Sequence, residues 1–560
     1  MTIEPQVPDD TNSHDSAQER DELAWESQFP GASQGRSSKR SVSQQLVDLA
    51  RSDFTFGLDQ NEKSFGVRKG HHTAHYVSGG ARSVRQQIAK KFNHLTGKVA
   101  SQTALTELVS VLEFECAEKE PTKTYLRGAR IGSGEILIDL GDRKEHVVRV
   151  TADGWEVLGA DAPIDALFRR TKLTGSLPVP ERSGDLDLLW KHVNMPSIAD
   201  QQVLKGWLVA THILQGLPCP ILAVLGEQGT AKTSSARCAV ALTDPSPAPI
   251  RRPPNDVNKL LHAVHGSRVT AFDNLSSIPK SISDAMCRVV TGESDVDRSL
   301  YSDDDLRVIS VQGVLVFTGI DVGALNGDLA ERCVWANLEV IPPTARRSES
   351  ELQEEWKKDY PSIFGGLLDL LVQTLAQLPN VNLPERPRMA DFAEVLAAID
   401  LATGSKVLER YWRSQEAVAS DIVETDDFLI AIAEKIRSRW TGTAKQLHSV
   451  LPARDGDKYW PTARGMNGKL KRVGPDLRKA GWTVVETKAD PASKRAAMWT
   501  LEPPPAPGSG PQVAPSAGAS HSTASHGTRN AAPVELLRVT PGNQPGSPPT
   551  VEVHPISPTS

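Results

Sequence analysis

The amino-acid sequence predicts an α/β protein of several domains with a parallel sheet at its centre. Between residues 196 and 342, apolar runs of strand length alternate with helical stretches, which is the order that parallel sheets produce. Two of the runs, Pro220–Leu225 and Gly313–Thr318, are apolar along their length, as expected for strands buried on both faces. The 560 residues exceed what one hydrophobic core usually holds, so we expect two to four domains.

The composition of both ends differs from that of the middle. Residues 1–44 are rich in Ser, Asp, Gln and Glu, and residues 502–560 in Pro, Ser, Gly and Ala. Both segments have too few apolar residues to form a core, so we expect a disordered arm and a disordered tail. The domains predicted between them are, in order, 45–195 (α+β), 196–342 (parallel-sheet core), 343–440 (helical) and 441–501 (small and basic).

Local patterns support this division. The N-terminal region contains a predicted helix at Ser83–His94 and a predicted hairpin formed by Glu135–Leu140 and His146–Val150, and Pro178 and Pro180 indicate its end. The helical domain is predicted from the apolar spacing of its residues. That spacing runs along Phe364–Leu378 and Phe392–Leu401.

The bulk composition indicates a cytoplasmic protein. The chain is 39% hydrophobic and 24% charged, with a formal net charge of −6. It has no run of 18 apolar residues and no basic start followed by an apolar core, so we expect neither a membrane span nor a secretory signal. The five cysteines are scattered and form no zinc pattern. We interpret the His71–His75 cluster as solvated surface rather than as a metal site.

The loop after Pro220–Leu225 carries the strongest motif. Its sequence is Gly226-Glu227-Gln228-Gly229-Thr230-Ala231-Lys232-Thr233, and a helical stretch begins near Ser234. Strand, glycine-containing loop and helix in this order are typical of a P-loop, in which backbone N–H groups and the helix N-terminus bind phosphate. Lys232 is then expected to bridge the β- and γ-phosphates of ATP, and the Thr233 hydroxyl to ligate Mg²⁺.

One position departs from the P-loop pattern. The glycine usually found before the lysine is Ala231 here. We expect its methyl group to be tolerated provided that the residue is already helical.

A second motif supplies an acid. The apolar run Arg268–Phe272 ends in Asp273, which is expected to hold Mg²⁺ opposite Thr233. Many motor ATPases have a glutamate next, to orient the attacking water, but this chain has Asn274. An amide binds water without acting as a base, so either hydrolysis is slow or another acid serves.

Two further residues are candidates for sensing the γ-phosphate. Thr318 ends the third apolar run, where such folds place a polar sensor, although a strand that simply ends in Thr is an equally good interpretation. Arg332 follows at the spacing of an arginine finger, which stabilises transition-state charge on a neighbouring subunit's nucleotide. A solvated helix arginine is the alternative.

These motifs resemble a family of ATP-binding proteins carried by actinobacteria, their phages and integrated elements. The matching landmarks are Gly226–Thr233, Phe272–Pro279, Arg298–Asp303, Asp328–Arg332, Arg388–Phe392 and the turn between Asp139 and Trp155. The resemblance covers roughly residues 125–500 and is similar in architecture to the helicase half of viral and plasmid primase–helicases, related to superfamily 3 and AAA+ motors. It implies a ring-forming ATPase that works on DNA during replication of a phage or mobile element. It also implies Asn at the sensor position, where this chain has Thr318.

Two segments are candidates for contacting DNA. In superfamily 3 motors the interval after the acid strand holds a hairpin that lines the pore, and here it contains Arg298 and Arg307 together with several aspartates. The second segment, 441–501, reads as helices followed by a β-hairpin, which is the winged-helix pattern. Its second helix is predicted at about residues 462–473. The basic residues expected to bind DNA there are Arg464, Lys469, Lys471 and Arg472.

The sequence therefore favours a DNA-dependent ATPase, either a helicase or a helicase-like motor. A nucleotide-gated assembly switch with little turnover is the alternative, and Ala231 and Asn274 both favour it. A small-molecule kinase is disfavoured because a winged helix has no role in one.

Overall fold

The structure, a computed structural model, describes residues 40–132, 134–275, 278–292, 294–298, 306–319, 327–451, 460–487 and 497–504. All the elements below belong to one compact unit that extends to Pro504. Nearly all of the predicted arm and tail lie outside the described residues. The first helix, α2 (Val42–Asp53), begins inside the predicted arm, because Ser41 caps it and Leu46 and Leu49 are buried.

The N-terminal region has a hydrophobic core of its own. Helices α2, α3 (Val84–Thr96) and α4 (Gln102–Ala117) pack together around apolar residues of all three. The predicted helix at Ser83–His94 is confirmed, with Ser83 as its cap. The accompanying sheet has the order β4-β1-β2-β3-β10-β5. Its strands are β1 (Phe54–Asp59), β2 (Ser64–Arg68), β3 (Thr73–Tyr76), β4 (Pro121–Thr122), β5 (Thr124–Tyr125) and β10 (Leu167–Arg169).

A four-stranded antiparallel sheet follows and packs on the main core rather than on the N-terminal one. Its strands are β6 (Gly128–Ile131), β7 (Glu135–Asp139), β8 (Val147–Thr151) and β9 (Gly154–Leu158). The predicted hairpin is confirmed as the β7–β8 pair. Ile136, Val148 and Trp155 belong to the same buried cluster as the central sheet. The main core therefore crosses the boundary predicted near residue 195.

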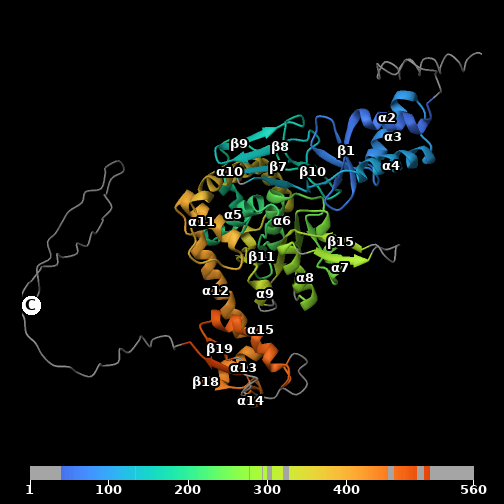
Figure 1. Cartoon of the computed structure of the whole chain (residues 1–560). Coiled ribbons are helices and arrows are strands. Elements are labelled where there is room, and N and C mark those ends of the chain that lie inside the picture. The colour runs from blue at the N-terminus through green and yellow to red at the C-terminus, as the bar shows by residue number, and fades with distance from the viewer. Residues whose placement is uncertain are drawn as a thin grey trace, which may run out of the picture. The chain divides into compact units, whose positions relative to one another are not determined.

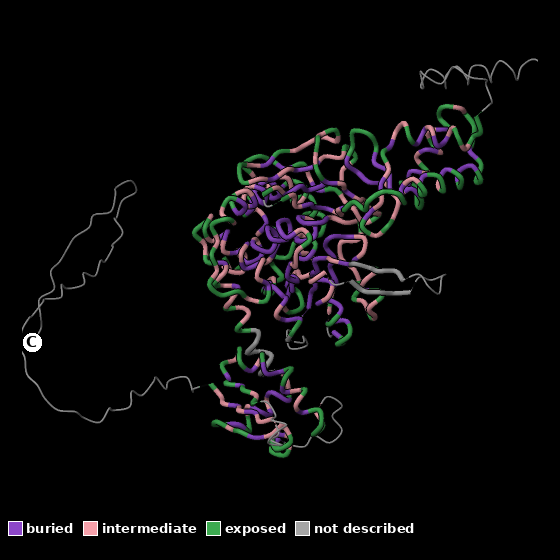
Figure 2. The backbone as a smooth tube through the Cα atoms, viewed as in Figure 1, coloured by how far each residue is buried: buried purple, intermediate pink, exposed green. Residues whose placement is uncertain are grey.

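The central sheet is parallel throughout, as the alternation of strands and helices predicted. Its order is β12-β13-β16-β11-β17. The strands are β11 (Ile221–Leu225), β12 (Ile250–Arg251), β13 (Val269–Phe272), β16 (Val314–Gly319) and β17 (Cys333–Asn337). The helices interspersed with them are α5 (Ile198–Ile213), α6 (Lys232–Thr243), α7 (Val257–His265), α8 (Lys280–Thr291) and the short α9 (Gly327–Ala330) (Figure 1). Every residue of β11 and β13 is buried, as expected for strands covered on both faces (Figure 2).

A buried ion pair joins the antiparallel sheet to the end of α6. Arg127, 1% exposed, lies just before β6, and its Nε donates to Asp244 Oδ1 over 2.8 Å. Its Nη atoms donate to the carbonyls of Asp139 and Gly175, each over 2.8 Å. The other carboxylate oxygen of Asp244 accepts the backbone N–H of Arg268 over 2.7 Å, just before β13. Both charges are thus compensated away from water.

The helical region packs against the antiparallel sheet and against α5. It consists of the 3-10 turns η1 (Leu186–Lys191), η2 (Pro343–Ala345) and η3 (Leu378–Asn380), and the helices α10 (Glu349–Gln377), α11 (Ala390–Thr403) and α12 (Val407–Thr425). Among the described residues, the segment Glu349–Asn380 is long and apolar enough to cross a membrane by length and composition alone. Half of its 18-residue apolar stretch is buried inside the protein. Since Phe364, Leu367 and Leu371 lie in the main core, we interpret α10 as a core helix.

The C-terminal elements alternate as helix, strand, two helices and two strands. They are α13 (Asp427–Lys435), β18 (Trp440–Gly442), α14 (Ala444–Val450), α15 (Met466–Lys479), β19 (Thr483–Thr487) and β20 (Met498–Glu502). The strands form an antiparallel sheet of order β18-β20-β19. The helix predicted at about 462–473 begins later and runs through Pro475. Leu470, Val473 and Leu477 are buried on one face, and this packing outweighs the backbone bond that proline removes.

Candidate nucleotide-binding site

The loop between β11 and α6 requires two glycines. Gly226 has φ 154°, and a Cβ there would lie 2.8 Å from Thr230 Oγ1 and 2.9 Å from the Leu338 carbonyl oxygen. Gly229 has φ 87°. The loop then turns into α6, whose first backbone N–H groups have no acceptor within the helix. The loop and the helix end therefore form a site suited to an anion.

Ala231 does not meet the condition under which its methyl group was expected to be tolerated. It has φ 65° and ψ 33°, in the left-handed region, and it precedes the first residue of α6 instead of belonging to the helix. A left-handed alanine costs about 1–2 kcal/mol because its Cβ approaches the next carbonyl. The chain therefore carries backbone strain at the position where P-loops usually have glycine.

The Lys232 ammonium lies across the loop. Its Nζ donates to the carbonyl oxygens of Gly226, over 2.7 Å, and Glu227, over 2.6 Å. The Thr230 hydroxyl donates to the Glu227 carbonyl over 3.0 Å and closes the same turn. These contacts hold the positive charge of the Lys232 ammonium against the carbonyl oxygens of the loop.

Asp273 brings three segments together at the carboxyl end of the sheet. Its Oδ1 accepts the hydroxyl of Thr233 over 3.0 Å and that of Thr318 over 2.5 Å. The Thr318 hydroxyl in turn accepts the backbone N–H of Asn274 over 2.8 Å. This arrangement follows from the topology, since β16 pairs with both β11 and β13. The carboxylate is therefore fixed beside the first turn of α6.

The oxygen atoms of this cluster fit a small hard cation. Mg²⁺ prefers oxygen ligands, and the Thr233 hydroxyl and the Asp273 carboxylate supply two of them side by side. Asn274 has φ 57°, which asparagine tolerates better than most residues. Thr318 is 1% exposed, and its hydroxyl donates to Asp273. In this structure its side chain therefore positions the Asp273 carboxylate.

Arg332 is not placed as an arginine finger requires. Its side chain is 10% exposed, and its Nη1 donates to Asp328 Oδ2 and to the Asp328 carbonyl oxygen, each over 2.7 Å. A finger must reach out from the surface. The more exposed guanidinium nearby is that of Arg388, which is 43% exposed and pairs with Asp328 over 2.6 Å and with Glu331 over 3.0 Å.

Sequence reasoning missed two residues at the loop. Arg346 Nη2 lies 3.3 Å from where a Cβ on Gly229 would be, and Asn194 Nδ2 donates to the Thr230 carbonyl oxygen over 3.4 Å. Neither belongs to a motif. Asn194 precedes α5 and Arg346 follows β17, so only the folded chain brings them to the loop.

The candidate DNA-contacting residues lie on two elements. The interval after the acid strand forms an antiparallel pair, β14 (Ser294–Arg298) and β15 (Leu306–Ser310), as predicted, while 299–305 lies outside the described residues. In the C-terminal region Arg464 and Arg472 are exposed. Lys469 pairs with Asp426 over 2.9 Å and Lys471 with Glu486 over 3.0 Å.

The prediction of a solvated His71–His75 cluster is wrong for one member. His72 is 3% exposed and packs edge-on against Phe168, with 6.0 Å between ring centroids. Burial lowers its pKa, so the ring is neutral at pH 7. Among the described residues no group of three or more potential metal ligands occurs.

Two family models match the chain. Residues 186–421 match the model described as the actinomycete integrative conjugative element (AICE) replication protein, and residues 427–517 match the AICE RepA C-terminal domain. The chain carries both domains of AICE RepA. The first RepA domain contains the loop, Asp273 and Thr318, and the second begins at the first residue of α13. This identifies a replication protein of a mobile element, as the resemblance implied.

Comparison with solved structures adds little to the RepA match. Three apo structures of the C-terminal region of NrS-1 align with TM-scores of 0.34, 0.33 and 0.33 at 10–11% identity. The alignments cover 82–83% of this chain and 98–100% of those chains. Scores this low carry no conclusion. No curated protein gave a match.

Proposed function

We propose that this RepA-type protein is a Mg²⁺-dependent P-loop ATPase that acts as a DNA-dependent motor, of helicase type, in replication of its mobile element. The observation that carries the proposal is the convergence of Thr233 and Thr318 on Asp273, next to the loop that holds Lys232. An anion-binding loop beside an oxygen cluster is what a metal–triphosphate complex needs.

Each residue then has a role in the proposal. Backbone N–H groups of residues 227–234 would hold the phosphates, and Lys232 would exchange its loop carbonyls for phosphate oxygens. Thr233 and Asp273 would hold Mg²⁺, which supplies charge neutralisation at the transferring phosphate. Asn274 would orient the attacking water by hydrogen bonding.

The C-terminal elements support the DNA part of the proposal. A helix, a strand, two helices and a two-stranded hairpin follow one another in the order of a winged helix, with α15 in the place of the recognition helix. Exposed Arg464 and Arg472 suit contact with phosphates. We further propose a homo-oligomeric ring, with Arg388 better exposed than Arg332 to meet a neighbouring subunit.

A second function, an ATP-gated assembly switch with little turnover, is favoured by two observations. Asn274 supplies no base, and Ala231 strains the loop at a position where glycine would be relaxed. In this alternative ATP binding changes assembly, and hydrolysis is incidental.

The test is ATP turnover measured with and without single- and double-stranded DNA, for the wild type and for Asp273→Ala. We expect DNA to stimulate the wild type, and the variant to retain nucleotide binding while losing Mg²⁺-dependent turnover. ATP-dependent oligomerisation without DNA-stimulated turnover would favour the switch. Unchanged turnover in Asp273→Ala would show that the metal is held elsewhere.

A further inference from the structure

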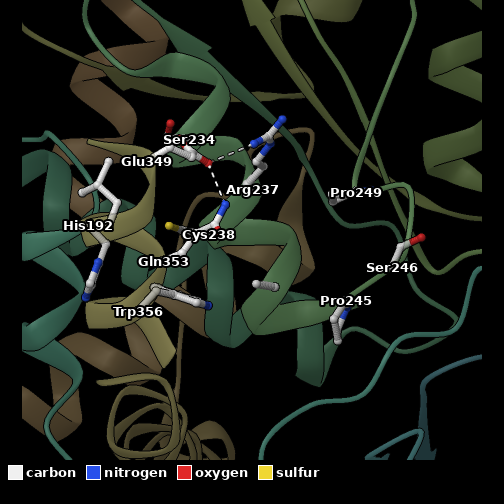
Figure 3. Close-up of a pocket in the computed structure, with 12 residues that line it drawn as sticks. His192, Ser234, Arg237, Cys238, Pro245, Ser246, Pro249, Glu349, Gln353 and Trp356 are labelled. Atoms are coloured by element: carbon white, nitrogen blue, oxygen red, sulfur yellow. Dashed lines mark hydrogen bonds and ion pairs between the residues drawn. The ribbon is translucent and has the colours of Figure 1, made fainter. Parts of the chain in front are cut away.

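A cavity of about 290 Å³ lies between α6 and α10 (Figure 3). One wall consists of residues of α6, from Ser234 to Ala241, and another of residues of α10, including Trp356. Pockets for whole drug-sized ligands measure roughly 300–1,000 Å³, so this one suits a single ring system with part of a sugar.

One end of the cavity lies beside the proposed phosphate site. Ser234, which follows the proposed metal ligand Thr233, is at one end of the α6 wall, and Cys238 and Ala241 lie further along the same helix face. Seven residues of helix span about 10 Å, at 1.5 Å per residue. A nucleotide whose phosphates lie at the N-terminus of α6 would therefore have this wall within reach of its sugar and base.

The chemistry of the walls suits an uncharged aromatic ring. Trp356 stacks on Tyr360 with centroids 4.8 Å apart and planes at 30°, and His192 meets it edge-on at 5.1 Å. Its indole is thus held in place where it lines the cavity. Burial raises the pKa of the Cys238 thiol to about 12, so the thiol on the opposite wall carries no charge at pH 7. Polar groups lie elsewhere on the lining, where Arg237 pairs with Glu349 over 3.5 Å.

We propose that this cavity holds the base of the bound nucleoside triphosphate, between Trp356 of α10 and Cys238 of α6. The proposal rests on the proposed ATPase function and adds to it the residues that separate a nucleotide from a bare triphosphate. Glu349 and Arg237 then face the sugar.

The experiment compares ATP with inorganic triphosphate, which has no base, by calorimetric titration in the presence of Mg²⁺. Base–aromatic stacking contributes roughly five- to 150-fold in affinity, so we expect the wild type to prefer ATP by about tenfold or more. Trp356→Ala removes the aromatic wall of the cavity, and Cys238→Phe fills the cavity. Both variants should lose the preference for ATP while binding triphosphate as the wild type does. Trp356→Phe should keep most of it. Trp412→Ala, at a half-buried tryptophan of α12 that does not line this cavity, is the matched control.

The outcomes separate this proposal from the ATPase proposal. A wild type that binds neither ligand overturns the ATPase proposal and this one with it. A wild type that binds ATP, with unchanged ATP affinity in both Trp356→Ala and Cys238→Phe, overturns the base site alone. Loss of triphosphate binding in both variants would mean that these residues support the loop instead of a base, and would also overturn it. If Trp356→Ala loses triphosphate binding while Cys238→Phe keeps it, the test rests on Cys238→Phe. Loss of its preference for ATP supports the base site, and an unchanged preference overturns it.

Discussion

The candidate nucleotide site and the C-terminal region differ in how they hold polar side chains. At the candidate nucleotide site the polar groups point inward and hydrogen-bond to one another: the Thr318 hydroxyl, on a residue that is 1% exposed, lies 2.5 Å from Asp273 Oδ1. On and near α15 the basic groups are on the surface, and Lys471, 55% exposed, pairs with Glu486. The first arrangement depends on the position of each atom. The second depends mainly on total charge, so its interactions should be tolerant of single changes and sensitive to salt.

The largest expected effect is that of Lys232→Ala on ATP binding. Hydrogen bonds to charged groups contribute about 1.5–3 kcal/mol, so we expect the affinity to fall roughly ten- to 150-fold. Calorimetric titration with ATP and Mg²⁺ measures this. Lys280→Ala, at an exposed lysine that begins α8, is the control and should bind as the wild type does. Equal affinities in all three proteins would mean that the loop does not bind phosphate.

The next effect concerns DNA and should be spread over several residues. Reversing the charges of Lys469, Lys471 and Arg472 together should weaken binding to all sequences about equally. If each of the three side chains contacts one phosphate, the negative slope of log affinity against log salt should become shallower by about 3. Because Lys469 pairs with Asp426, a melting curve must accompany the titration. Loss of preference for one sequence, with the salt slope unchanged, would instead indicate base contacts.

A smaller effect is predicted for stability at Asp476 of α15. Burial, then the nearby charges of Glu331 and Asp426, raise the pKa of this carboxyl to about 6 from 3.8. The folded state therefore binds the proton more tightly, and its stability falls as the pH rises from about 4 to 6. Asp476→Asn should be more stable than the wild type at pH 7 by about 1 kcal/mol, a figure that already includes a discount for partial solvent exposure. The gain should be absent at pH 4. Denaturant unfolding at both pH values measures it, and an equal gain at both would exclude the carboxylate as its cause.

The smallest effect is expected at Ala231. Glycine relieves about 1–2 kcal/mol of left-handed strain in the folded state. It also increases the entropy of the unfolded chain, which lowers the stability of the folded state by about 0.4–1 kcal/mol. Ala231→Gly should therefore raise the free energy of unfolding by roughly 0.5–1 kcal/mol. Ala241→Gly, in the interior of α6, should lower it by about 1 kcal/mol and serves as the opposite control. Destabilisation by both substitutions would contradict the strain at Ala231.

The parts of this molecule that sequence predicted well are those where one local pattern sufficed. The parallel sheet and the loop follow from apolar runs that end in Gly226 and Asp273, and the carboxyl ends of such strands meet at one edge. The bounds predicted for the helix at about 462–473 were less accurate. Pro475 does not end α15, because the buried face of the helix holds it together.

Other features depend on contacts between distant segments and leave no local sign. Arg388 comes from a segment more than 50 residues away and binds Asp328, the same carboxylate that holds Arg332. His72 is buried because Phe168 packs on it. Arg346 lies beside Gly229 because the chain after β17 runs next to the loop after β11, its neighbour in the central sheet.

The ion pair between Arg127 and Asp244 has a consequence for where the chain can be cut. The RepA match starts at residue 186, which suggests a convenient start for a shorter protein. Such a fragment would lack Arg127 and leave the Asp244 carboxylate, 4% exposed in the whole protein, without its guanidinium. It would also uncover the apolar side chains that Ile136 and Trp155 cover. The smallest autonomous fragment should therefore begin before Arg127 and keep the antiparallel sheet together with the central parallel sheet.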